Sequence, residues 1–446
     1  MAGGTWLSQN KKRPGAYINF KSVPRPSMTV GDRGIVAIPM SLSWGNEGEL
    51  IEVLSTELLD GSSRKKVGFD AFSPESKLLA GALSYCYKAL VYRMNSGGAK
   101  ATATIGSDDD EMTITAKHTG TYGNKIMVAV VANGSLFDVI TYVDGSVVNS
   151  QTVATIPELD DNDYVSFAGT GTPTANAGTT LTRGTDGTST ETTAYPLFLN
   201  ALKMAHFQTV AIPTSETTIK SSIVTFIQNL RENEGRYIQA VVADYDGADY
   251  EGIINSVNGC TIDGVEYSKE EFTAIVAGMT AGANFNQSNT ARKITGATKI
   301  IGELNDAEIK EGLGKGKFIL STSANGDIKV EQDINSHHTY TKDKDYNFSK
   351  NRVLRTLDEI GTTTRITWEN TYMGKVDNNR TGRGLFKSDL VAYGNELQRL
   401  SGIQEFNGSD DITIEQGNDL DSVIVEWYVK PVDSMEKLYM NVMVKG

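Results

Sequence analysis

The sequence predicts a multidomain protein in which a β-rich domain interrupts an α/β domain and an α+β part follows. Short apolar strands alternate with helical periodicity in residues 31–96 and again in residues 194–336. Between residues 97 and 193 the composition changes to Thr, Gly and Asp, and hairpin turns replace the helical periodicity. From residue 337 onward, helical stretches precede three strands. A chain of 446 residues is also too long for one hydrophobic core.

The first 30 residues predict an extended N-terminal arm. Pro14, Pro24 and Pro26 exclude a long helix because proline lacks the backbone donor that a helix needs. One short alternating stretch is compatible with a strand: Tyr17, Ile18, Asn19 and Phe20. We expect this strand to lack a local partner. The arm has no apolar core of the kind found in secretory signals or membrane anchors.

The first half of the α/β domain predicts a strand and then a helix. The strand is GIVAIP, which starts at Gly34. Ser73 and Pro74 are typical of a helix start, since Ser caps the first turn and Pro suits its first position. The spacing then predicts one apolar helix face formed by Leu79, Leu83, Cys86 and Leu90.

The β-rich stretch is marked by two hairpin turns. Asn133-Gly134 and Asp144-Gly145 each separate alternating apolar runs, and both pairs are typical of type I′ turns. The stretch is acidic, and its exit after Gly169 is rich in Thr and Gly. We therefore expect a compact all-β domain inserted into the α/β domain.

The second half of the α/β domain returns to helices and strands. Residues 196–207 and 215–234 have helical spacing. Ser268 and Glu271 predict a capping box, in which each residue bonds the other's backbone at a helix start. Asn325-Gly326 predicts a further hairpin.

The C-terminal part, residues 337–446, predicts helices over 349–360 and 388–400 and then strands. The strands are DITIEQ, SVIVEWYVKPV and the terminal KLYMNVMVKG. The last strand ends close to the terminus, where chains usually fray, so we expect it to pair with something outside its own fold. Its residues are Lys437, Leu438, Tyr439, Met440, Asn441, Val442, Met443 and Val444.

Charge is distributed unevenly along the chain. The formal net charge is −13, yet residues 1–33 carry six basic residues against one acidic residue and residues 337–400 carry eleven against eight. An acidic body argues against nucleic acid as a partner, because phosphate binding needs a concentrated basic face. No apolar run approaches the length of a membrane span, so we also expect no membrane insertion.

The residue types that carry catalysis and metal binding are sparse. Cys86 and Cys260 are far apart, too few for a clustered zinc site, and expected to be buried thiols. His337 and His338 are adjacent, and neighbouring strand residues point to opposite faces. The glycine-rich run 312–317 leads into a strand, whereas a phosphate loop opens a helix. The sequence therefore predicts no enzyme activity, no cofactor and no metal site.

Several strings resemble the tail sheath family of contractile phages, particularly those of Gram-positive hosts, and the related bacteriocin particles. They are GGTWLSQNKKRPGAYINF at the start, AGANFNQSNT (281–290), SKNRVLRTLDEI (349–360), YMGKVDNNRTGRGLFKSDLVAYGNELQ (372–398) and IQEFNGSDDITIEQGNDLDSVIVEWYVKPVDSMEKLYMNVMV (403–444). The resemblance covers nearly the whole chain and is weakest in the β insert.

The resemblance implies a subtilisin-like α/β core without catalytic duties, an outer β-sandwich at 97–193 and an inner C-terminal domain that touches the tail tube. It implies that both terminal strands add to sheets of neighbouring copies, and that the subunit polymerises helically and contracts. Implied partners are other copies, the tail tube, the baseplate and the tail terminator. The implied location is a virion tail or an extracellular tail-like particle, assembled in the bacterial cytoplasm. The candidate tube-facing residues are Lys350, Arg352, Arg355, Lys375, Arg380 and Arg383.

Two other functions stay open. A phage baseplate protein or adhesin would use the Thr- and Gly-rich β segment to bind the host surface, which predicts sugar binding by residues 97–190. A hydrolase on the α/β core would react with a serine-directed probe.

Overall fold

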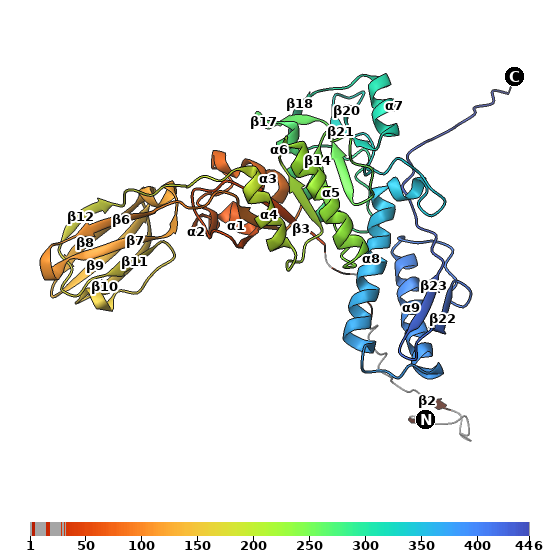
Figure 1. Ribbon diagram of the computed structural model, residues 1–446, viewed down its shortest axis with the longest axis horizontal. Helices are drawn as coiled ribbons and strands as arrows, with labels where there is room; N and C mark the ends of the chain where they lie inside the picture. The colour runs from red at the N-terminus through yellow and green to blue at the C-terminus, as the bar shows by residue number, and fades with distance from the viewer. Residues whose placement is uncertain (1, 5–14, 18–27, 29–30, 32, 446) are drawn as a thin grey trace. The chain divides into compact units, whose positions relative to one another are not determined.

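The computed structural model describes residues 2–4, 15–17, 28, 31 and 33–445 (Figure 1). The chain divides into two compact units. The larger unit comprises Gly31–Thr362 and Pro431–Gly446, and the smaller unit comprises Met1–Val30 and Thr363–Lys430. The stretches 337–362 and 431–446, which were predicted to be part of the C-terminal domain, lie in the larger unit.

A seven-stranded sheet forms the centre of the larger unit. Its strand order is β19-β15-β14-β13-β3-β5-β4, and every neighbouring pair is parallel except β4 with β5. The strands are β3 (Ile35–Met40), β4 (Leu50–Leu54), β5 (Lys88–Arg93), β13 (Thr209–Ile212), β14 (Gln239–Ala243), β15 (Ile253–Ser256) and β19 (Lys317–Phe318).

Helices cover both faces of this sheet. Along β3, Val36 and Ile38 join a core with α3 (Lys77–Leu83) and α6 (Lys269–Gly282). Ile35 and Ala37 face the opposite way, into a core with α4 (Glu191–Leu202) and α5 (Thr217–Glu232). A parallel sheet buried on both faces is typical of three-layer α/β folds, which agrees with the predicted alternation of strands and helices.

In the larger unit, a prediction that depends on a few neighbouring residues is confirmed, and one that depends on a longer apolar pattern is not. Ser268 Oγ accepts from the Glu271 N–H and the Glu271 carboxylate accepts from the Ser268 N–H, so the capping box opens α6. The predicted long face through Leu90 is wrong, because α3 ends at Leu83 and Leu90 lies in β5. An apolar run shared by a short helix and a buried strand imitates one longer helix.

Smaller elements complete the α/β core. They are α1 (Ser55–Asp60), α2 (Arg64–Val67), β16 (Gly259–Ile262), β17 (Val265–Tyr267), β18 (Ala297–Ile301), α7 (Asp306–Gly314), β20 (Leu320–Thr322) and β21 (Ile328–Val330). β20 and β21 form the hairpin predicted at Asn325-Gly326. Helix α8 (Asn351–Thr367) starts in the larger unit and continues past its boundary at residue 362.

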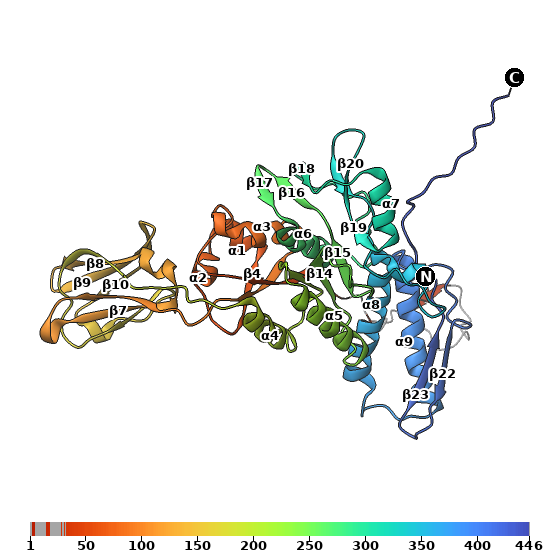
Figure 2. The ribbon, with the colours of Figure 1, turned by 45° about the horizontal axis from the view of Figure 1, so that its top comes forward.

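The inserted segment forms two antiparallel sheets, with orders β10-β9-β8-β12 and β11-β7-β6 (Figure 2). The strands are β6 (Lys100–Ile105), β7 (Met112–Thr119), β8 (Ile126–Asn133), β9 (Leu136–Val143), β10 (Ser146–Val153), β11 (Val165–Ala168) and β12 (Asn176–Thr180). Asp144 and Gly145 form the two-residue loop between β9 and β10, and φ is 49° and 77° there, as a type I′ turn requires. In the other hairpin Asn133 still pairs with Leu136, so the loop is Gly134-Ser135 and not Asn133-Gly134.

A tryptophan of the α/β domain completes the core of this sandwich. Trp44 lies between β3 and β4, is fully buried, and packs among the sandwich residues. Its ring lies edge-on to His118 at 4.9 Å and 5.4 Å from Tyr122, and its Nε1 donates to the Lys65 carbonyl at 3.0 Å. Burial, followed by nearby positive charges, lowers the pKa of His118 to about 4, so this contact is made by the neutral imidazole.

A buried arginine joins the segments that enter and leave the sandwich. The Arg93 guanidinium donates to the carbonyls of Gly45 and Thr119 at 2.9 Å and of Asp186 at 3.1 Å. Beside it, Gly120 approaches the Ser43 carbonyl so closely that a Cβ would lie 1.9 Å from the oxygen. The glycine-rich segments at this joint are therefore packed and bonded.

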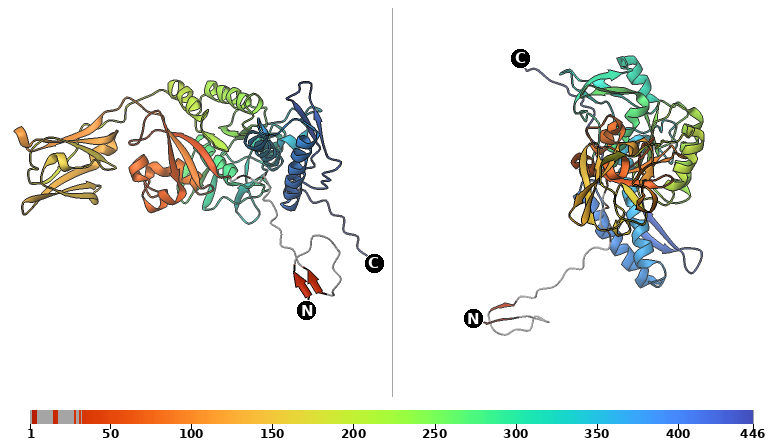
Figure 3. Two further views of the ribbon diagram at one scale, coloured as in Figure 1. Left: turned by 90° about the horizontal axis from the view of Figure 1, so that it is seen from below. Right: turned by 90° about the vertical axis from the view of Figure 1, so that its left-hand side faces the viewer.

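The smaller unit contains the rest of α8, the π-helical turn Trp368–Tyr372, α9 (Arg380–Arg399) and the hairpin of β22 (Ile412–Gln416) and β23 (Val423–Trp427). Helix α9 packs on β22. The unit also includes β1 (Ala2–Gly4) and β2 (Gly15–Tyr17), which pair in parallel (Figure 3). Among the described residues, no helix is long and apolar enough to cross a membrane.

Candidate functional site

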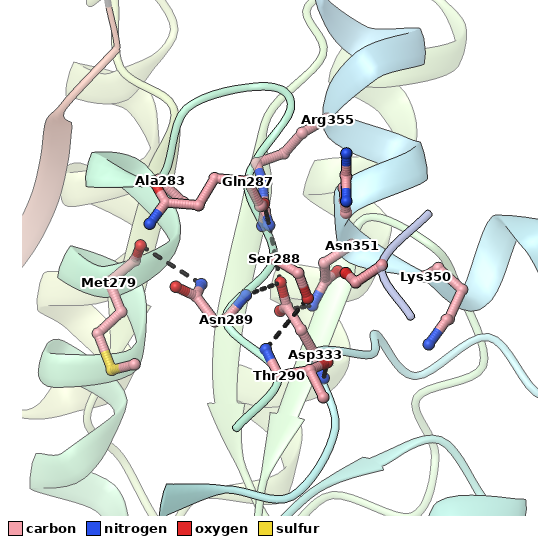
Figure 4. Close-up of polar contacts among 12 residues, drawn as sticks. Met279, Ala283, Gln287, Ser288, Asn289, Thr290, Asp333, Lys350, Asn351 and Arg355 are labelled. Carbon is pink, nitrogen blue, oxygen red and sulfur yellow. Dashed lines mark hydrogen bonds and ion pairs between the residues drawn. The ribbon is translucent and has the colours of Figure 1, made fainter. Parts of the chain in front are cut away.

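A buried carboxylate, Asp333, gathers three segments of the larger unit (Figure 4). It accepts from the Asn289 N–H at 2.9 Å, from Asn351 Nδ2 at 2.9 Å and from Arg355 NH2 at 2.7 Å. Burial alone would raise the pKa of Asp333, but Arg355 and the other donors outweigh it and lower the pKa. The carboxylate is thus charged, and it fixes the start of α8 to the loop before residue 290.

A second carboxylate, Glu436, lies next to this cluster. It accepts from Thr290 Oγ1 and from Gln332 Nε2, both at 2.7 Å, and forms an ion pair with Lys350. Thr290 Oγ1 also accepts from the Asp333 N–H at 2.9 Å, so the two carboxylates belong to one network. The side chain of Glu436 is 11% exposed and that of Lys350 is 4% exposed.

The residues after Glu436 are exposed. Residues 437–445, here called the C-terminal arm, lie in no helix or strand, and Leu438 and Tyr439 are 84% and 90% exposed. Met440, Val442, Met443 and Val444 are also largely exposed. Lys437 and Asn441 are exposed as well. Among the described residues this segment is an extended tail without a strand partner (Figures 1 and 3). Most of its exposed side chains are large and apolar.

The N-terminal strand has a different environment. Tyr17 lies in β2 and is paired in register with Gly4 of β1, so the expectation that it lacks a local partner is wrong for this residue. Ile18, Asn19 and Phe20 lie outside the described residues. Gly31, just after the arm, donates its N–H to Glu359 Oε1 of α8 at 2.9 Å.

The candidate basic surface separates into two groups. Lys350 and Arg355 are 3% and 1% exposed and are paired with Glu436 and Asp333, so they are not surface residues of their unit. Arg352 is partly buried, and burial lowers its pKa. Charge spacing in the sequence does not distinguish an outward cation from one that neutralises a buried carboxylate.

The remaining three basic residues lie in the smaller unit. Lys375 and Arg380 are exposed and Arg383 is partly exposed. Lys375 and Arg383 border a cleft of about 630 Å³ that has Trp368, Tyr372 and Phe386 among its lining residues. Arg383 donates to Asn378 Oδ1 at 2.8 Å.

Sequence reasoning missed the acceptor and donor residues at the base of the C-terminal arm. Glu436, Gln332 and Thr290 are far apart in sequence, and their patterns match no common motif. Thr290 does end the string AGANFNQSNT that carries part of the family resemblance, and this was the available clue.

Three family models match successive parts of the chain. They describe a phage tail sheath protein beta-sandwich domain at residues 96–186, a phage tail sheath protein central domain at 188–336 and a phage tail sheath C-terminal domain at 343–445. The chain belongs to the phage tail sheath protein family. The resemblance found in the sequence is therefore confirmed.

Two curated relatives of this sheath protein align with nearly its full length. It is 36% identical over 476 aligned residues, covering both chains completely, to the uncharacterized protein YqbK of Bacillus subtilis. It is 35% identical to the phage-like element PBSX protein XkdK of the same bacterium, over 99% of each chain. A tail sheath protein of Clostridium phage phiCD119 is 29% identical over 201 residues, which is 45% of this chain and 56% of that protein.

Solved structures agree with this family. The sheath tail protein of Desulfitobacterium hafniense has a TM-score of 0.81 and 38% identity, covering 97% of this chain and all of that one. The sheath tail protein of Listeria innocua has a TM-score of 0.82 and 36% identity over 93% and 95% of the two chains. The helical sheath of the anti-feeding prophage in its contracted state shares the fold, with a TM-score of 0.58 and 8% identity over 97% and 99% of the chains.

Proposed function

We propose that this chain is the structural subunit of a contractile sheath, which polymerises helically around a tail tube and shortens to drive the tube through a cell envelope. The observation that carries the proposal is the C-terminal arm, which leaves a buried ion pair at Glu436 and then exposes its apolar side chains. Such a segment can be completed by the sheet of a neighbouring copy.

Strand addition would hold neighbouring subunits together and still let their domains move. Each backbone hydrogen bond contributes about 1 kcal/mol net, so one short strand binds weakly by itself. Two arms on one subunit raise the effective concentration of each other, so residues 1–30 and the C-terminal arm together hold neighbours firmly. Contacts that do not close on themselves extend into a helix.

The acceptor surface in this proposal is the two-stranded hairpin of the smaller unit. Both of its outer edges are free of strand partners among the described residues. Ile424 and Val425 of β23 are 53% and 36% exposed, so added strands would cover apolar surface. Contraction would be a change between two packings, with the extended one kinetically trapped until the baseplate releases it.

The tube is proposed to contact the smaller unit through Lys375, Arg380 and Arg383. Their side chains are at least partly exposed, whereas Lys350 and Arg355 are buried. Further proposed partners are the baseplate and the tail terminator, with no nucleic acid and no membrane insertion. The proposed location is a virion tail or an extracellular tail-like particle assembled in the bacterial cytoplasm.

The core is proposed to be subtilisin-like and to have no catalytic role. Its parallel sheet covered by helices on both faces supports the comparison at the level of layers. Family membership and the absence of a serine-nucleophile motif in the sequence support the missing activity.

Negative-stain electron microscopy of the purified protein tests the proposal. The full chain is expected to form hollow tubes, and chains lacking residues 1–26 or residues 437–446 are expected to form none. Tubes of normal length from both truncated chains would overturn the role of the arms. A full chain that stays monomeric and binds host glycans would favour the baseplate or adhesin function.

A further inference from the structure

Helix α8 contacts the chain at the base of both terminal segments. Glu359 of α8 accepts from the Gly31 N–H at 2.9 Å, where the N-terminal segment ends. Lys350, directly before the helix, pairs with Glu436, where the C-terminal arm begins. We infer that α8 is the common support of both arms, with Glu359 and Lys350 as the residues that position them. This inference rests on the proposed function of the terminal segments as assembly arms.

The contact between Lys350 and Glu436 anchors the start of the C-terminal arm. Glu436 has three side-chain donors, namely Thr290, Gln332 and Lys350, and Lys350 also lies 3.4 Å from Asp433. The Glu436 side chain is 11% exposed, whereas Met435 before it is fully exposed and Leu438 after it is 84% exposed. This carboxylate is therefore the last anchored side chain before the C-terminal arm.

The contact at Glu359 involves a second, neighbouring bond. Glu359 is 5% exposed, and two residues after Gly31 the Arg33 Nε donates to the Ala283 carbonyl at 3.0 Å. Ala283 begins the loop that also supplies Asn289 and Thr290 to the carboxylate network. The N-terminal segment thus enters the larger unit against the same helix and the same loop that hold the C-terminal arm.

Between these two contacts the helix is bonded to the α/β core. Arg355 pairs with Asp333 at 2.7 Å, and Asp358 pairs with Arg231 of α5 at 2.6 Å. All four side chains are at most 7% exposed. Positions 350 and 359 are separated by about 14 Å of helix at the usual rise per residue. Force applied to one arm would therefore reach the other arm through residues 350–359. It would not pass through the inserted sandwich or through the strands that lie far from α8.

NMR order parameters of the backbone, measured on the unassembled protein, test the C-terminal contact. Lys350→Met should lower the order parameters of residues 432–436 from about 0.85 to below about 0.6 and leave those of residues 351–362 unchanged. Lys344→Met is the matched control, because it removes an ion pair with the buried Glu251 in the same unit without touching either arm. The charge-swapped double variant Lys350→Glu with Glu436→Lys should restore the high order parameters, and it keeps the test valid if Lys350→Met folds poorly.

Hydrogen exchange tests the N-terminal contact, because the Gly31 N–H is bonded to Glu359. Glu359→Ala should speed exchange at Gly31, whereas Glu359→Gln keeps an acceptor oxygen and should preserve the slow exchange. Unchanged order parameters in Lys350→Met together with unchanged exchange in Glu359→Ala would overturn the inference, as would loosening of both arms by either single change. Because these measurements use single subunits, they decide the support role separately from tube formation, which decides the proposed function.

Discussion

Trp44 and Leu438 are both large apolar side chains beside a segment that leaves the α/β core, and their exposed fractions are 0% and 84%. Trp44 is buried in the inserted sandwich, where Arg93 also ties three backbone carbonyls together. Leu438 follows an anchored carboxylate and is mostly exposed. The joint between the α/β core and the sandwich hides its apolar surface within one chain, whereas the proposed assembly arm would offer its apolar surface to another chain.

The largest effect is expected from a substitution at the joint between the α/β core and the inserted sandwich. Trp44→Ala should lower the free energy of unfolding by about 3–5 kcal/mol, because it removes a fully buried indole and leaves a cavity between the two domains. Chemical denaturation followed by circular dichroism measures it. Phe72→Ala is the control, since Phe72 is 86% exposed and should change little. Equal losses in the two variants would refute the distinction.

A smaller loss is expected at the arginine of the same joint. Arg93→Met would leave the carbonyls of Gly45, Thr119 and Asp186 without this donor, at a cost of about 3 kcal/mol. Thermal unfolding measures the change against Arg399→Met, whose guanidinium pairs with Glu396 and is 67% exposed. A melting temperature for Arg93→Met as high as that of the control would contradict the assigned role.

Acid should loosen the C-terminal arm. Burial raises the pKa of Glu436, but hydrogen bonds from Lys350, Gln332 and Thr290 outweigh it, and the net pKa lies below the ordinary value of 4.5. A carboxyl with a depressed pKa contributes stability above its unfolded pKa and loses it as the pH falls through the folded value. The NMR order parameters of the backbone at residues 432–436 should therefore be high at neutral pH and fall below about pH 4.5.

Glu436→Gln separates this titration from general acid unfolding. The amide keeps one acceptor oxygen but cannot be ionised, so residues 432–436 should have lower order parameters at neutral pH and lose the acid-dependent step. The order parameters at the Trp44 joint should be identical in both proteins. An acid step of unchanged size in Glu436→Gln would assign the titration to another group.

The smallest effect on the single chain is expected from removing the arm itself. Deletion of residues 437–446 should change the free energy of unfolding by less than about 0.5 kcal/mol, because exposed side chains contribute little. The same deletion should abolish tubes. A large loss of stability would show that the arm packs on its own chain, and would place it with Trp44 instead of opposite to it.

The sequence allowed prediction where the determinants are local. Asp144-Gly145 and the pair Ser268 and Glu271 act within a few residues, so their turn and cap were predicted correctly. The sequence strings that resemble tail sheath proteins predicted the family. The burial of Lys350 and Arg355 could not be predicted, because their partners Glu436 and Asp333 are 86 and 22 residues away. Trp44 was missed for the same reason, since its neighbours belong to a domain inserted later in the chain.

The place of the insertion has a consequence for synthesis on the ribosome. Strand β3 (Ile35–Met40) pairs with β13 (Thr209–Ile212), so the middle of the central sheet stays incomplete until the whole sandwich has been made. The sandwich strands, in contrast, pair within residues 100–182, and Trp44 has already emerged when they do. At about 5–20 residues per second, the nascent chain spends several seconds with a finished outer domain and an unfinished core. The sandwich domain therefore completes its fold first. The central sheet is completed later, and until then its apolar strand β3 lacks its neighbour β13.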